Sequence, residues 1–297
     1  MKKKPSIKNG IAISVVAILA IVLFMVRIKS DFGGLLPKSE EVDDNASTII
    51  NAGDTSVDLS LVEVNEDFFN SMNEKELIHY KVINSIDFFD TVEGEFQNFG
   101  FYFDDTVKYI IDIKNNRSFE HEESSEKNID SIFNDYKCIE LDNTDNTYKN
   151  IQVLNKAGEE PSYLRKFKPK QRYDGNGILS NRSTILISGA GRSVLAEETL
   201  GGHLRDHERW SIDGSEEFIG RKCTKISGER EVVDTKTKVS KFTALIDTET
   251  GVVLKYDEMD ASGKAVNGFE TKYIKYNETY DPEIFKISTE GYTEKVY

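Results

Sequence analysis

A run of sixteen residues close to the N-terminus, Ile11 to Val26, contains a single polar side chain, Ser14. A transmembrane helix needs about 17–25 predominantly apolar residues, and the run reaches that length when it is counted with its flanks as residues 10–28. A cleaved signal peptide is the alternative, because its apolar region spans about 7–15 residues and precedes a small-residue cleavage site. Residues 27–30 read Arg-Ile-Lys-Ser, with no Ala-x-Ala pattern and no cysteine for lipid attachment. We therefore expect residues 10–28 to be an uncleaved transmembrane anchor.

The charges on either side of this run predict its orientation. Four lysines lie within residues 1–9, whereas only Arg27 and Lys29 follow closely behind the run. By the positive-inside bias, residues 1–9 form a cytoplasmic basic tail in a single-pass protein of the cell membrane, and the rest of the chain is extracytoplasmic. Residues 29–70 contain several Gly, Ser and Asn and more acidic than basic side chains. Such a segment is typical of an extended tether, here leading to an exported domain over residues 71–297.

The charge of the exported part restricts its partners. Apart from the six basic residues that flank the apolar run, the chain has 32 basic and 52 acidic side chains, a formal charge of -20. Nucleic-acid binding depends on a concentrated basic surface, so we expect no nucleic-acid partner. The same charge repels anionic lipid headgroups at long range, which argues against adsorption flat on a membrane.

A helix signal marks the start of the exported domain. Asn73 is a favourable N-cap, and Glu76 stands three residues further on, as in a capping box. Apolar residues then recur at helical spacing up to about Asp90. These residues are Ile78, Val82, Ile86 and Phe89. We expect one helix that packs this stripe against the rest of the domain.

After Asp90 the apolar residues alternate with polar ones, which is the period of half-buried strands. The expected strands cover residues 93–103, 107–113, 116–121, 136–141, 162–168, 183–188, 207–213, 219–228, 238–247, 252–257 and 270–276. Residues 188–202, flanked by glycines, predict a short helix between them. Because flat sheets of this breadth curl or split, we expect a mainly β (α+β) fold: a strongly curved antiparallel sheet or unclosed β-barrel with a packing helix.

Few residues are candidates for chemistry. His203 and His207 are four residues apart, but no third ligand stands at a known metal-site spacing. We interpret them as two solvent-facing histidines at the mouth of a strand. Adjacent acids such as Glu122 and Glu123 point to opposite faces of a strand and form no catalytic pair by themselves. We expect no catalytic residues, no metal and no cofactor, and hence a protein that is not an enzyme.

The two cysteines, Cys138 and Cys223, each lie in an expected strand. Outside the cytoplasm two thiols can oxidise to a disulfide, provided that their Cα atoms come within about 7 Å of each other. The sequence does not fix that distance. Two separate or buried free cysteines are the interpretation that we favour.

The C-terminal half of the chain resembles a known superfamily. An ordered series of structural motifs carries the resemblance: Gly-Arg-x-Cys at 220–223, Ile246-Asp247 ending a strand, a Thr250-Gly251 turn, Lys255-Tyr256, a glycine hairpin, and Asp-Pro-Glu-Ile-Phe at 281–285. The end of the expected helix and the strand after it also match the opening of the same proteins, over residues 83–97 with the sequence INSIDFFDTVEGEFQ. Over about residues 72–288 the chain is similar to the LolA-like lipoprotein carriers and outer-membrane lipoprotein-sorting proteins, a superfamily that includes periplasmic regulators of envelope-stress sigma factors.

This resemblance implies an unclosed antiparallel barrel wrapped over helices, whose concave apolar face holds an acyl chain or a partner's hydrophobic segment. The residues expected to line that face are Phe96, Phe101, Tyr109, Ile111, Ile187, Trp210, Leu245 and Leu254. The alternative is that these side chains pack on the helix and leave no cavity.

The anchor distinguishes this chain from a true carrier, because a shuttle must leave the membrane. We therefore expect a membrane-anchored extracytoplasmic domain that binds a lipid, a lipoprotein acyl chain or a membrane protein, as a sensor or regulator of envelope signalling. The alternatives are a structural protein-interaction scaffold without a ligand and a hydrolase of envelope polymers.

Overall fold

The computed structural model describes residues 61–100, 104–151, 162–182, 189–230 and 238–295. The expected anchor and residues 29–60 of the expected tether lie outside these ranges. Within the described ranges, no helix combines the length and the apolar character that crossing a bilayer requires. The anchor, its orientation and the domain boundaries therefore stay predictions.

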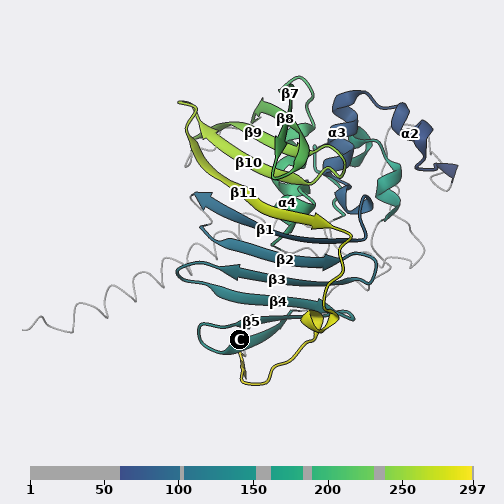
Figure 1. Ribbon diagram of the computed structural model, residues 1–297. Helices are drawn as coiled ribbons and strands as arrows, with labels where there is room; N and C mark the ends of the chain where they lie inside the picture. The colour runs from purple at the N-terminus through teal and green to yellow at the C-terminus, as the bar shows by residue number, and fades with distance from the viewer. Residues whose placement is uncertain (1–60, 101–103, 152–161, 183–188, 231–237, 296–297) are drawn as a thin grey trace, which may run out of the picture. The chain divides into compact units, whose positions relative to one another are not determined.

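In the described part of the chain, twelve strands form one sheet in the order β12-β6-β5-β4-β3-β2-β1-β11-β10-β9-β8-β7 (Figure 1). The strands are β1 Thr91–Gly100, β2 Thr106–Asp112, β3 Arg117–Glu123, β4 Asn128–Asn134, β5 Lys137–Asp142, β6 Thr147–Ile151, β7 Trp210–Phe218, β8 Arg221–Glu229, β9 Val239–Asp247, β10 Val253–Asp260, β11 Ala265–Tyr276 and β12 Thr293–Glu294. The strands at its two edges, β12 and β7, do not pair with each other, so the sheet is not closed. Only the short β12 pairs in parallel, with β6. The expected mainly β fold with an unclosed, curved antiparallel sheet is confirmed.

Two runs of consecutive strands, β1–β6 and β7–β11, meet where β1 pairs with β11. The short helices precede β1, separate β6 from β7, or follow β11. They are α2 Glu66–Asn70, α3 Glu74–Val82, η2 Ser85–Asp87, η3 Ser162–Lys166, η4 Pro169–Arg172, α4 Gly191–Val194, η6 Glu197–Gly201, α5 Gly202–Leu204 and η7 Pro282–Phe285. Both α3 and α4 lie beside the β9–β11 part of the sheet (Figure 1). We call the face that α4 covers the inner face.

The predicted N-terminal helix is confirmed at its start and is shorter than expected at its end. Asn73 and Glu76 form the capping box, each side chain bonding the other residue's backbone N–H at 3.0 Å. The helix α3 stops at Val82, because Asn84 leaves helical geometry and its Nδ2 donates to the carbonyl of Tyr80. A 3-10 turn, η2, replaces the last predicted turn. The expected apolar stripe is nevertheless buried at all four positions.

Several strand predictions are wrong, for reasons visible in the side-chain pattern. Residues 162–166 of the predicted strand 162–168 form the 3-10 helix η3, and the buried Leu164 is followed three residues later by the half-buried Phe167, just beyond its end. The strands β4 and β6 were not predicted. Most of their residues are half-buried on both faces, so apolar and polar residues do not alternate clearly along them. Strand β7 begins at Trp210 instead of residue 207. The predicted strand 183–188 lies outside the described residues.

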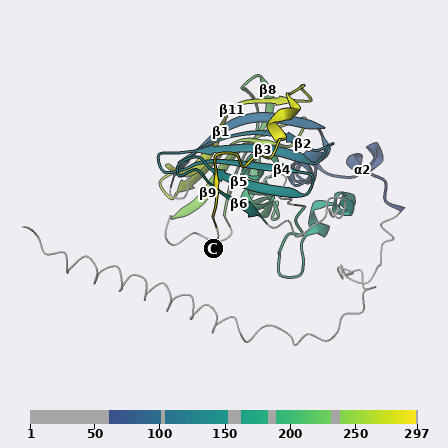
Figure 2. The ribbon, with the colours of Figure 1, turned by 90° about the horizontal axis from the view of Figure 1, so that it is seen from below.

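Two hydrophobic clusters lie on opposite faces of the sheet. The larger one, on the inner face, joins α3 and α4 to the strands, and Val194 and Leu200 within it are fully buried. The smaller one lies on the outer face of β3–β6 and joins Ile139 and Leu141 to Tyr292 of the C-terminal segment. That segment crosses these strands in Figure 2, where η7 packs on β3 and β4.

Candidate binding site

The residues that the sequence predicted as a binding face form the core in this structure. Six of them are described, and each exposes at most 6% of its surface: Phe96, Tyr109, Ile111, Trp210, Leu245 and Leu254. Phe101 and Ile187 lie outside the described residues. The six belong to one cluster with α3, α4 and η6 packed among them. Their side chains therefore fill the space between sheet and helices, and their part in ligand binding stays a prediction.

A network of buried charges holds this helical cover in place. The guanidinium of Arg172 donates to Glu197 Oε1 at 2.6 Å, and both side chains are fully buried. Arg172 and Arg182 each donate to Asn84 Oδ1, and Arg182 also pairs with Asp87 at 2.7 Å. Burial raises the pKa of Glu197 and lowers that of Arg172, because a low-dielectric site disfavours both charged forms. The network joins α3 and η2 to the segment between β6 and β7.

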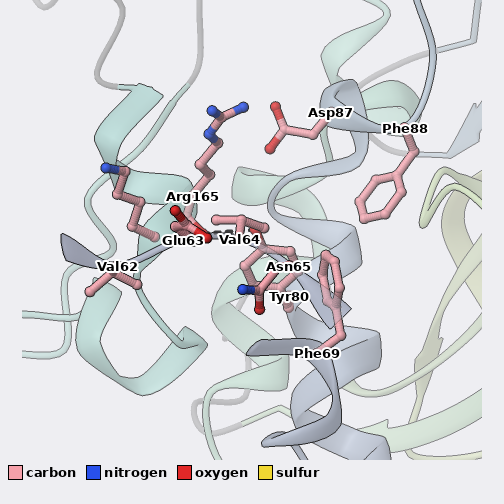
Figure 3. Close-up of a pocket in the computed structure, with 10 residues that line it drawn as sticks. Val62, Glu63, Val64, Asn65, Phe69, Tyr80, Asp87, Phe88 and Arg165 are labelled. Carbon is pink, nitrogen blue, oxygen red and sulfur yellow. Dashed lines mark hydrogen bonds between the residues drawn. The ribbon is translucent and has the colours of Figure 1, made fainter. Parts of the chain in front are cut away.

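An open groove of about 590 Å³ lies beside α3 and η2, where the described chain begins. Figure 3 shows its lining residues, which come from four places in the sequence. Residues 62–65 and Phe69 come from the first turns of the described chain, Tyr80 from α3, Asp87 and Phe88 from η2 and its C-cap, and Arg165 with Lys166 from η3. The groove therefore depends on tertiary contacts between the N-terminal helices and the segment that follows β6.

Aromatic rings form one wall of the groove. The ring of Phe69 lies 5.6 Å from that of Tyr80 and 6.4 Å from that of Phe88, measured between centroids. Both phenylalanines are half-buried, so their rings are packed on one side and face the groove on the other. Tyr80 donates its hydroxyl to the carbonyl of Arg165 at 2.7 Å, which ties α3 to η3. Burial raises the pKa of Tyr80, so it stays a neutral donor.

Charged groups form the other wall. Arg165 is exposed and Lys166 half-buried, and both project from η3. Of the acidic lining residues, Asp87 is held by Arg182, and Glu63 precedes α2. A groove with aromatic rings on one side and cations on the other suits an amphipathic ligand better than a plain hydrocarbon.

Two smaller pockets open elsewhere on the described surface. One, of about 320 Å³, lies over the ends of β7–β10 and is lined partly by Trp210, Phe242 and Met259. The other, of about 70 Å³, lies on the inner face of β3–β5 beside Glu120 and Cys138. Glu120 Oε2 accepts backbone N–H bonds from Gly189 and Ala190 at 2.6 and 3.1 Å. Burial raises the pKa of this carboxyl to about 7, although these two bonds favour the ionised form.

The two histidines of the sequence motif are half-buried, so the prediction that they face solvent was wrong. His203 stacks on Phe242 with 5.4 Å between ring centroids, while His207 meets the edge of Trp210 at 5.7 Å. Burial lowers the pKa of His203 to about 4. Among the described residues, no cluster of three or more His, Cys, Asp or Glu side chains is arranged to hold a metal ion.

Cys138 and Cys223 are both free thiols and both buried. The preferred interpretation of two separate cysteines is therefore confirmed. Burial raises the pKa of each thiol to about 11, so neither is reactive near neutral pH.

The groove was not predicted from the sequence, because residues 61–70 were assigned to the tether. The signal was present: Asn65 caps α2 through a bond from Phe68 N at 3.0 Å, and two acids occupy the first turn. The two phenylalanines that follow are also unusual for a tether. No comparable signal marked η3, which provides Arg165 and Lys166 to the groove, and that segment was predicted as a strand.

No protein-family model matches the sequence, and a search of curated proteins finds no match. Solved structures similar to the chain include an uncharacterized conserved protein from Thermus thermophilus, with 7% identity, a TM-score of 0.41, and coverage of 75% of this chain and 100% of that one. MucB in its complex with MucA from Pseudomonas aeruginosa shows 9% identity and a TM-score of 0.43, over 75% of this chain and 64% of that one, less than two thirds of its length. Lipoprotein LppX from Mycobacterium tuberculosis shows 10% identity and a TM-score of 0.38, over 70% and 97%.

Each of these TM-scores is below 0.5. The function is therefore inferred below from the residues of this chain.

Proposed function

We propose that this protein is a membrane-anchored, extracytoplasmic binding domain that holds an amphipathic ligand in the groove beside α3 and η2. The ligand is an acyl chain of a lipid or lipoprotein, or a hydrophobic segment of a membrane protein. The observation that supports this is the contrast between the filled inner face and the open aromatic groove of about 590 Å³. A groove of this size falls in the range of small-molecule sites. Signalling through a regulatory partner is the further role that we infer for an anchored protein of this kind.

The buried ionisable groups of the described chain support binding over catalysis. Glu197 is bonded to Arg172, Glu120 to two backbone N–H groups, and His79 to the hydroxyl of Tyr173 at 2.8 Å. Each of these contacts fixes one part of the fold against another. A hydrolase needs a nucleophile or carboxylate pair that faces a substrate cleft, whereas these groups are bonded to protein atoms and the pocket beside Glu120 measures only about 70 Å³.

Native mass spectrometry of the full chain released from detergent tests the proposal. We expect co-purifying lipid on the wild type and its loss in Phe69→Glu, because a charge on the aromatic wall would lie against the buried chain. The matched control is Met259→Glu, which places the same charge in the 320 Å³ pocket and should leave the lipid bound. Circular dichroism verifies that both variants fold.

Other outcomes would reject the groove. Loss of lipid in Met259→Glu alone would move the site to the pocket at β7–β10. No lipid or added fatty acid on the wild type would favour the scaffold without a ligand. Leu254, fully buried in the core, is unsuitable for such a test, because a charge there is expected to unfold the domain.

A further inference from the structure

The strongest local concentration of positive charge in the described part of this acidic chain lies beside the groove. Residues 163–173 contain five basic side chains and no acidic one, whereas the whole chain has a net charge of -14. Four of the five belong to the surface, and the fifth, Arg172, is turned inward to Glu197. A cluster of this kind creates a local positive potential against the sign of the whole domain.

Two of these surface cations have no acidic partner among the described residues. Arg165 and Lys170 are exposed, and neither forms an ion pair with any described residue. The ammonium of Lys168 donates to the carbonyl of Ser71 at 3.0 Å, which leaves its charge uncompensated. We call the surface formed by Tyr163, Arg165, Lys166, Lys168 and Lys170 the basic face.

Apolar side chains accompany the charges. Tyr163 exposes 49% of its surface, and its ring lies 6.4 Å from that of Phe167 on the next turn. Leu61, at the first described position, exposes 79%. Rings with a polar tip are the side chains that settle at a lipid–water interface, whereas an acidic peptide would need only the cations.

The chain leaves the domain at the same place. Residues 62–65 line the same groove as Arg165 and Lys166, and Figure 3 shows Glu63 beside Arg165. The N-terminal 60 residues therefore connect to the domain beside the basic face. If residues 10–28 are the anchor, residues 29–60 link this side of the domain to the bilayer.

We propose that the basic face docks on anionic lipid headgroups of the bilayer that holds the anchor. The proposal rests on the anchoring proposed above and goes beyond it by naming a second contact with the membrane. The net negative charge of the domain opposes approach at a distance, but that repulsion is screened beyond about 8 Å at physiological ionic strength. At contact, the four cations and Tyr163 meet the headgroups, and the exposed Glu63, which lines the same groove as Arg165, opposes them with one negative charge. The cations outnumber it, so the charge argument against flat adsorption does not apply to this face.

A fluorescent label at Tyr163 tests the docking in the full chain. In a Tyr163→Cys variant the added thiol is exposed, whereas Cys138 and Cys223 are buried, so an environment-sensitive dye reacts at one position. The labelled chain is reconstituted in vesicles of phosphatidylcholine with or without phosphatidylglycerol. We expect a blue shift of the emission with phosphatidylglycerol only, and its reversal in high salt.

Two charge variants show whether the basic face itself is responsible. Arg165→Glu with Lys170→Glu should abolish the shift. Lys222→Glu with Lys264→Glu changes the net charge equally at two exposed lysines on the β7–β8 and β10–β11 sides of the sheet, and should preserve it. Equal loss in both pairs would mean that overall charge decides, which overturns the proposal.

The remaining outcomes also decide the question. An equal shift in vesicles with and without phosphatidylglycerol would mean that something other than anionic headgroups covers the basic face, which contradicts docking on them. No shift in either vesicle, with the chain floating with the vesicles, rejects docking and leaves the anchor intact. Failure to float with phosphatidylcholine vesicles rejects the anchor and the docking with it.

Discussion

The two halves of the sheet differ in where they bury apolar side chains: β7–β11 bury them mainly on the inner face, whereas β3–β6 bury them on both faces, with Phe133 and Cys138 in the inner cluster. Strands β7–β11, with β1 and β2, turn residues such as Phe242 and Tyr256 toward the helices of the inner face. Strands β3–β6 turn Ile139 and Leu141 to the outer face, beneath the C-terminal segment. On the inner face of this second half, Glu120, Ser131 and Glu140 lie opposite one another across three strands. An inner face that is apolar throughout, as the family resemblance implied, is therefore absent from the described strands.

The comparison shows how a broad sheet remains stable without closing. Strands β7–β11, with β1 and β2, are covered on the inner face by α3, α4 and η6. Strands β3–β6 are covered on the outer face by the C-terminal segment. Each half thus acquires a partner layer, which is what a sheet with one hydrophobic face requires. The predictions below test these layers, from the largest expected effect to the smallest.

The charged network that fixes the helical cover should contribute most. Arg172→Ala leaves the buried Glu197 with the backbone N–H of Arg182 but without its charged partner, so we expect the free energy of unfolding to fall by about 3–5 kcal/mol. The control is Lys255→Ala, which removes a partly exposed pair with Glu270 and should cost at most about 1 kcal/mol. Chemical denaturation measures both. Similar losses in the two variants would contradict a special role for the cover.

The polar inner face of β3–β5 should make stability depend on pH. Because burial raises the pKa of Glu120 to about 7 from an ordinary value near 4.5, the folded state retains a proton that the unfolded state has lost. The contribution of this group is complete below about pH 4.5 and is lost as the pH rises through about 7. We expect Glu120→Gln to gain about 2 kcal/mol relative to the wild type between about pH 5 and pH 8.

Denaturation of both proteins across this range isolates Glu120, since the histidines are common to both. The pKa of His79 is lowered to about 3 by burial, so its contribution has the opposite sign and is lost as the pH falls below about 6.5. A difference between wild type and variant that does not change with pH would show that Glu120 is not protonated in the folded state.

The apolar inner face should be intolerant of added volume. A Cβ built on Gly94 would lie 2.6 Å from Cζ of Tyr109, whose ring covers this glycine from the next strand. Gly94→Ala should therefore destabilise the fold by about 1–3 kcal/mol. Gly175→Ala, in a turn where a Cβ meets nothing within 4 Å, is the control. A Gly94 variant as stable as this control would mean that the inner face is loosely packed and open to a ligand.

The smallest effect concerns the start of the helical cover. Asn73→Ala removes the side-chain oxygen that accepts the N–H of Glu76, at a cost of about 1 kcal/mol in the free energy of unfolding. Asn70→Ala, at the exposed end of α2, is the comparison and should change little. An unchanged denaturation midpoint for Asn73→Ala would indicate that packing alone sets the start of α3.

Local signals made α3 and most strands predictable. The capping box at Asn73 involves residues that are three apart in the sequence. Apolar and polar residues alternate along β2 and β10, because one face of each strand is buried and the other faces solvent. Residues 162–166 were assigned wrongly because a short 3-10 helix with two apolar residues resembles a short strand.

By itself, the sequence determined the class of fold, the start of the first helix, the excess of negative charge and the presence of an apolar N-terminal run, because each depends on neighbouring residues or on composition. Only the tertiary structure decided which apolar residues fill the core and which line a groove. Phe69 and Phe88 have the same side chain as Phe96, yet the first two are half-buried at the groove and the third is fully buried. That difference arises from what packs on each ring, and the packing partners come from segments up to about a hundred residues away, as η3 does for the groove.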